Sequence, residues 1–123
     1  MHRTTVFLLF IVLLLPAASG AERRSRWRAA WRVSQAMLAG ADAADAASSW
    51  GKNEMNPLVR VRGQFGYGSL AIKLGALAGG LAAQHYILRK APEQMPLCAS
   101  ANLAMAGLLA SVAARNLRVP AAK

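Results

Sequence analysis

Three of the five acidic residues in this chain fall within one short alanine-rich stretch, and they are the side chains best suited to chemistry. They are Asp42, Asp45 and Glu54, in a chain of 123 residues with a formal charge of +10. In a helix, carboxylates three residues apart share a face and could bind a divalent cation or relay protons. A metal site needs more converging ligands than these carboxylates, and no Cys/His spacing supplies them. No Ser/His/Asp constellation indicates nucleophilic catalysis. We therefore expect no enzymatic activity and no cofactor, and keep these three residues only as an alternative metal site.

A structural ion pair is the favoured role for the two aspartates. Lys73 lies in an apolar stretch, where an unpaired charge is expensive. If the two helices carrying these charges form an antiparallel hairpin, each charge lies roughly 7–10 Å from the connector at 1.5 Å per residue. Pairing of Asp45 or Asp42 with Lys73 would then offset much of their cost of insertion into a membrane. Gln84 shares the face of Lys73, so we predict a buried polar seam between the two helices.

Three helical segments are expected to position these residues, over 25–50, 65–90 and 95–116. Alanine, the best helix former, dominates the first of them. Its Trp31 and Trp50 would lie about 28 Å apart, which is typical of a helix anchored at both membrane interfaces. The sequence therefore predicts an all-α, membrane-embedded bundle. An arrangement in which only the second and third helices span obeys the positive-inside rule better and is the alternative.

The second helix also carries a packing motif. Gly75 and Gly79 form a GxxxG pattern in an apolar segment, which predicts close contact with another helix. That helix belongs either to the same chain or to a second copy.

The N-terminal residues 1–21 have the parts of an export signal. An apolar run of roughly ten residues follows His2 and Arg3, and small residues end at Ala21. Arginines come directly afterwards and resist translocation, so an uncleaved anchor is the alternative. Residues 22–123 would form a single helical membrane domain.

The connector after the first helix is expected to be a locked turn formed by Gly51, Glu54, Asn56 and Pro57. Asn56 precedes proline and is therefore pushed out of the helical region. The window from Asp45 to Leu58 resembles a family of uncharacterised small bacterial membrane proteins, which read approximately as Asp, then Ser or Thr, then G-x-x-E-x-N-P-L. The resemblance implies an all-helical membrane protein and no known activity.

These observations favour a structural or accessory protein of the bacterial cell envelope, exported to the inner membrane. Its expected partners are anionic lipid and either a second copy or another membrane protein, because the chain is both basic and apolar. No exposed aromatic module indicates nucleic-acid binding. Two alternative functions are a transport, proton- or metal-handling element that uses the intramembrane aspartates, and a holin-like oligomeric pore former.

Overall fold

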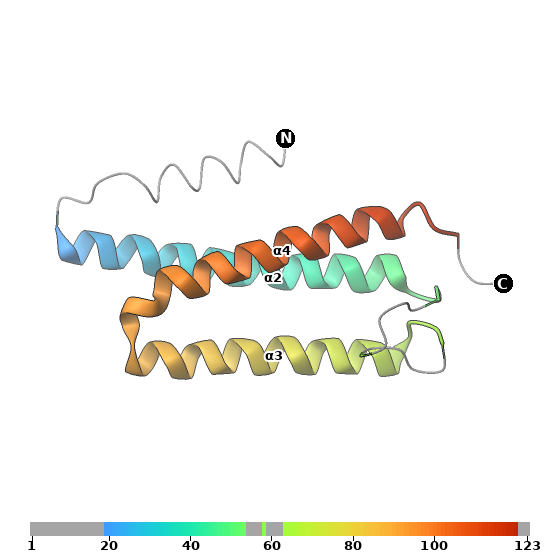
Figure 1. Ribbon diagram of the computed structural model, residues 1–123, viewed down its shortest axis with the longest axis horizontal. Helices are drawn as coiled ribbons and strands as arrows, with labels where there is room; N and C mark the ends of the chain where they lie inside the picture. Colours follow the sequence, from blue (N-terminus) through green and yellow to red (C-terminus); the bar gives the residue numbers. More distant parts are fainter. Residues whose placement is uncertain (1–18, 54–57, 59–62, 121–123) are drawn as a thin grey trace.

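The computed structural model describes residues 19–53, 58 and 63–120, and the regular elements in these residues are helices. They follow in the order α2 (Gly20–Ser49), α3 (Tyr67–Lys90), the short 3-10 helix η1 (Pro92–Gln94) and α4 (Met95–Asn116). Helices α2 and α4 run in the same direction. Helix α3, which comes between them in the chain, runs in the opposite direction (Figure 1). The prediction of an all-α chain with three long helices is confirmed.

Helix α2 begins five residues earlier than the predicted start at residue 25. The Ser19 hydroxyl accepts a hydrogen bond from the Glu22 backbone amide at 3.1 Å, which caps the first turn. Glu22 then pairs with Arg26 one turn later, at 2.5 Å. The helix therefore begins within the predicted signal segment, residues 1–21. The rest of the predicted signal segment, residues 1–18, lies outside the described residues.

The main packing partner of α2 is α4, and Lys73 on α3 reaches the two aspartates of α2 across a wider gap. Figure 1 shows α2 and α4 side by side, with α3 approaching this pair less closely. Small buried side chains on both helices allow the close approach. These are Ala30 and Ala46 on α2, and Ala99, Ala106 and Ala113 on α4. Helix α3 instead reaches this pair through long polar side chains, among them Lys73 and Gln84.

The apolar core lies at the end of the bundle near η1. Trp31 is buried there against Leu88, Met95 and Cys98, with Trp27 packed on the outside of the cluster. His85 meets the Trp31 ring edge to face, with a centroid distance of 4.8 Å. Trp31 is therefore a core residue of the bundle, and its predicted place at a membrane interface stays a prediction.

The connector between α2 and α3 is closed at its base. The Gly51 amide donates to the Phe65 carbonyl at 3.0 Å, and the Phe65 amide donates to the Lys52 carbonyl at 2.9 Å. Gly51 has a φ of 70°, a left-handed conformation that glycine adopts without strain. The Trp50 ring covers this neck by edge-to-face contacts with Phe65 and Tyr67. The neck thus fixes where α2 ends and α3 begins.

One helical segment among the described residues is long and apolar enough to cross a membrane. It covers Pro92–Asn116 and has a mean hydropathy of 1.7. The sequence led us to expect three spanning helices. Both helices contain polar residues that lower their mean hydropathy. These are Asp42 and Asp45 in α2, and Lys73, Gln84 and His85 in α3.

Candidate functional site: two polar layers

A cluster of charged and amide side chains joins the three long helices near the connector. We call it the charged layer, and it consists of Asp42, Asp45, Lys73 and Asn116. The Lys73 ammonium lies 3.1 Å from the Asp42 carboxylate and also bonds to Asp45. The three side chains retain only 10–12% of their exposure. Charges buried to this extent are stable only when they are paired, and here one lysine serves two carboxylates.

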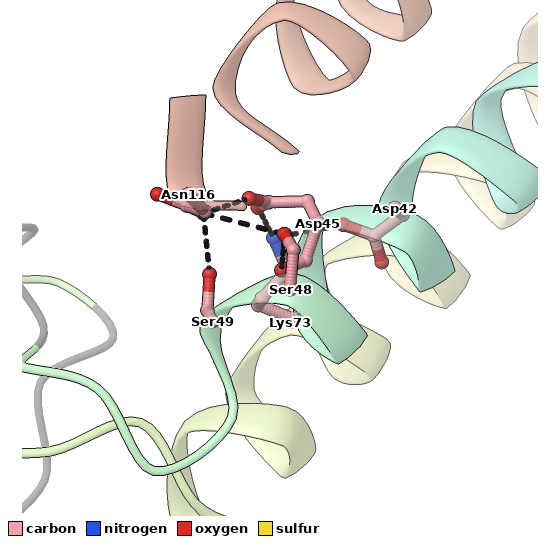
Figure 2. Close-up of polar contacts among 6 residues, drawn as sticks. All are labelled: Asp42, Asp45, Ser48, Ser49, Lys73 and Asn116. Carbon is pink, nitrogen blue, oxygen red and sulfur yellow. Dashed lines mark hydrogen bonds and ion pairs between the residues drawn. The ribbon is translucent and has the colours of Figure 1, made fainter. Parts of the chain in front are cut away.

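Asn116 brings the end of α4 into this layer. Its amide donates to the Asp45 carboxylate at 3.1 Å and to the Ser49 hydroxyl at 2.7 Å. Figure 2 shows Lys73 and Asn116 approaching Asp45 from different helices. Asp45 therefore accepts hydrogen bonds from both α3 and α4, whereas Asp42 is held by Lys73.

A second lysine secures the same end of the bundle. The Lys52 ammonium bonds to the backbone carbonyl of Asn116, at the C-terminus of α4. A cation at this position satisfies a carbonyl that has no partner within the helix and interacts favourably with the helix dipole.

A neutral cluster joins the same helices near η1. We call it the amide layer, and it consists of Trp31, Ser34, Gln84 and Asn102. The Gln84 carbonyl oxygen accepts hydrogen bonds from the Trp31 indole at 2.9 Å and from the Asn102 amide at 3.0 Å. The Gln84 amide donates back to the Asn102 carbonyl oxygen at 2.6 Å, and the Asn102 amide also reaches Ser34 at 3.0 Å. Asn102 is 2% exposed and Ser34 is fully buried, so this network replaces all the water these groups would otherwise bind.

A half-open pocket of about 290 Å³ separates the two layers. Asp42 and Lys73 lie at its rim, and so does Gln84. The rest of its wall is apolar and comes from α2, α3 and α4. Helix α3 is thus attached to the α2–α4 pair mainly through the two polar layers, with open space between them.

The structure brings Lys73 together with both Asp42 and Asp45, the residues predicted to pair. Gly51 forms the neck of the connector, while Glu54, Asn56 and Pro57 lie outside the described residues. Gly75 and Gly79 do not contact another helix closely within the described chain, since a Cβ added at either would meet nothing within 4 Å. Among the described residues the motif therefore makes no close helix contact, and its role in helix packing stays a prediction.

Asn116 and the amide layer as a unit were not predicted as site residues. Their spacing holds a signal that could have found them. Ser34 and Asp45 on α2, like Lys73 and Gln84 on α3, are eleven residues apart, and Asn102 and Asn116 on α4 are fourteen apart. Eleven and fourteen residues are close to whole numbers of turns at 3.6 residues per turn. Each helix therefore carries two polar residues on one face, separated by a similar distance.

The arrangement offers ion pairing and hydrogen bonding, and the described residues contain no group of three or more His, Cys, Asp or Glu side chains placed to hold a metal ion. Comparison with known protein families, with curated proteins and with solved structures found no match to this chain. The resemblance of the Asp45–Leu58 window to small bacterial membrane proteins accordingly stays a prediction.

Proposed function

We propose that this chain is a small accessory protein of the bacterial inner membrane, exported by its N-terminal segment, and that its role is structural rather than enzymatic. The observation that carries this proposal is the charged layer. Its carboxylates and its ammonium are held by one another and by Asn116, so each of them joins one helix of the bundle to another. The apolar segment Pro92–Asn116 supports the membrane placement.

Anionic lipid is the first proposed partner. The first turns of α2 project beyond the ends of α3 and η1 (Figure 1). The N-terminal half of α2 carries exposed arginines, which are Arg23, Arg24, Arg28 and Arg32. Basic residues next to a membrane contribute about 1 kcal/mol each to the attraction of anionic headgroups. We expect vesicles with anionic lipid to bind the chain more tightly than neutral vesicles, and replacement of these arginines by glutamine to remove the difference.

A helix from outside the chain is the second proposed partner, on the face of α3 that carries Gly75 and Gly79. This face lies opposite Lys73 and Gln84 on the helix, and small residues there allow close approach of another backbone. The second helix comes from another copy of the chain or from another membrane protein.

The decisive experiment is affinity purification of the full chain from membranes, with metal analysis of the same sample. We expect copurified lipid or protein and no stoichiometric metal. One equivalent of a divalent metal that disappears in Asp45→Asn would contradict the structural role and favour a metal-handling element. Failure of the chain to sediment with membranes would contradict the placement itself.

A further inference from the structure

The exposed side of each long helix is free of charged side chains over a continuous stretch. On α2 the exposed positions between residues 33 and 47 are alanine, glycine, valine or methionine. On α3 those between residues 68 and 83 are alanine, glycine, leucine or isoleucine. On α4 those between residues 97 and 114 are alanine, glycine, leucine or methionine, apart from two serines, of which Ser111 donates to the Gly107 carbonyl at 2.9 Å. We call these three stretches the apolar belt.

The charged side chains within the belt lie inside the bundle. Asp42 and Asp45 are buried, and both pair with Lys73. The half-buried Gln35 lies close to the edge of the belt on α2. A helix of a water-soluble bundle places charged residues on its exposed face. Charged residues within a membrane instead face the bundle interior and pair with one another, and the belt has this second distribution.

The two edges of the belt carry residues that favour a membrane interface. At the edge near η1, Arg32 is exposed on α2, and the Lys90 ammonium on α3 lies 5.6 Å from the centroid of the exposed Tyr86 ring. At the edge near the connector, the exposed Trp50 and Tyr67 rings meet edge to face. Tryptophan and tyrosine are enriched at both interfaces of a bilayer, and basic side chains there attract anionic headgroups.

The distance between the two edges matches the thickness of a bilayer. Trp31 contacts His85 near one edge, and Trp50 contacts Tyr67 at the other, so the edges of α2 and α3 are level. Along α2 the two tryptophans are about 28 Å apart, and along α3 Tyr67 and His85 are about 27 Å apart, at 1.5 Å per residue. The hydrocarbon core of a bilayer is about 30 Å thick.

We propose that the apolar belt faces the hydrocarbon of the bilayer on all three long helices, so that α2, α3 and α4 cross the membrane together as one unit. This orientation rests on the membrane placement proposed above and goes beyond it, because only the segment Pro92–Asn116 among the described residues has the mean hydropathy of a spanning helix. Mean hydropathy counts every side chain alike, whereas lipid meets only the exposed ones. Asp42 and Lys73 border the half-open pocket, but their paired side chains retain only 12% and 11% of their exposure.

Matched pairs of cysteines on the same helix can test the belt. Cys98 is the only cysteine, so Cys98→Ala gives a background without thiols. Each pair has one new cysteine within the belt and one beyond its edge, at positions that are exposed and do not line the pocket. The pairs are Ala43→Cys with Arg28→Cys for α2, Leu74→Cys with Arg89→Cys for α3, and Ala104→Cys with Arg118→Cys for α4. Leu74 points about 100° or more away from Gly75 and Gly79 at 3.6 residues per turn, so a helix on that glycine face would not cover it.

The full-length variants would be reconstituted in vesicles of phosphatidylcholine and phosphatidylglycerol, with a charged, water-soluble maleimide present on both sides. Maleimide reacts with the thiolate, which apolar surroundings disfavour. Each rate is divided by the rate for the same variant denatured in hot dodecyl sulfate. We expect every belt cysteine to react about tenfold or more slowly than its partner on the same helix. If the belt faced water, the two members of each pair would react alike, because both positions are exposed.

A second measurement shows whether lipid or protein protects the belt. Bimane attached to each belt cysteine would be reconstituted with phosphatidylcholine that carries a nitroxide on its acyl chain, which quenches bimane at short range. We expect quenching at all three belt positions. Slow labelling without quenching would show that protein covers that helix and would overturn the proposal.

Flotation of the same vesicles separates a failure of the belt from a failure of the membrane placement. A chain that floats with the vesicles but labels rapidly at Ala43→Cys or Leu74→Cys would overturn the crossing of all three helices and leave the membrane placement intact. A chain that does not float would overturn the placement and the belt together.

Discussion

The charged layer joins the three long helices near the connector, and the amide layer joins the same helices near η1. Both contain residues from α2, α3 and α4, and both are partly shielded from solvent, with Asp42, Asp45, Ser34 and Asn102 buried. They differ in what remains when one member is lost. Loss of Lys73 from the charged layer leaves two buried carboxylates without a cation, whereas loss from the amide layer leaves an unpaired neutral group, which is far less expensive. The comparison teaches that similar geometry can give the two ends of α3 different strengths of attachment.

Lys73→Met should have the largest effect, because it leaves Asp42 and Asp45 buried without a cation. Breaking a buried ion pair on one side typically costs about 3–5 kcal/mol. The free energy of unfolding can be measured in mixed micelles by circular dichroism, with protease accessibility of α2 as a second readout. As a control, the triple variant Asp42→Asn, Asp45→Asn, Lys73→Met removes all three charges and should recover more than half of the loss. A triple variant as unstable as Lys73→Met would show that the charges are not the cause.

Asn102→Leu should have an intermediate effect and test the amide layer directly. It leaves Gln84 and Ser34 without their shared partner, and an unsatisfied buried polar group costs about 1–3 kcal/mol. Ser111→Ala is the control on the same helix, because the Ser111 hydroxyl bonds to Gly107 on the exposed side. A loss for Asn102→Leu as large as that for Lys73→Met would remove the distinction between the layers.

Trp31→Phe should cost less, since it keeps an aromatic ring in the core cluster and removes the indole N–H that bonds to Gln84. Hydrogen bonds between membrane helices contribute about 0.6 kcal/mol on average and up to about 1.7 kcal/mol. The same unfolding measurement applies. Trp27→Phe, outside the cluster, is the matched substitution, and an equal loss there would mean that ring size rather than the hydrogen bond matters.

Lys52→Met should have the smallest effect. It removes the cation at the C-terminus of α4, an interaction worth about 0.3–1 kcal/mol near a surface. Salt screens such partly exposed interactions more than buried ones. The difference between wild type and Lys52→Met should therefore shrink as salt is added, while the difference for Lys73→Met persists. A salt-independent Lys52→Met effect would contradict this assignment.

The sequence predicted the pairing of Lys73 with the aspartates because a charge in an apolar helix requires a partner of opposite sign. It did not predict the amide layer, because a neutral group such as Asn102 or Gln84 does not specify which partner it takes. The position of α4 was missed for a related reason. Chain order favoured a hairpin of α2 and α3, but the small residues facing each other on α2 and α4 permit closer packing than the long inward side chains of α3. The neck at Gly51 was predicted as a turn, and its closure by Phe65 depends on a contact that no local pattern encodes.

The neck between α2 and α3 has a practical consequence for anyone who wishes to label or extend this protein. Asn53 and Gln64 pair across it, so the two helices are tied together before the intervening residues begin. Doubling the length of a flexible loop adds only about 0.6 kcal/mol of closure entropy. A peptide tag or a reporter domain inserted between Asn53 and Gln64 should therefore leave the helical bundle intact. This makes the connector a suitable place to determine on which side of the membrane it lies.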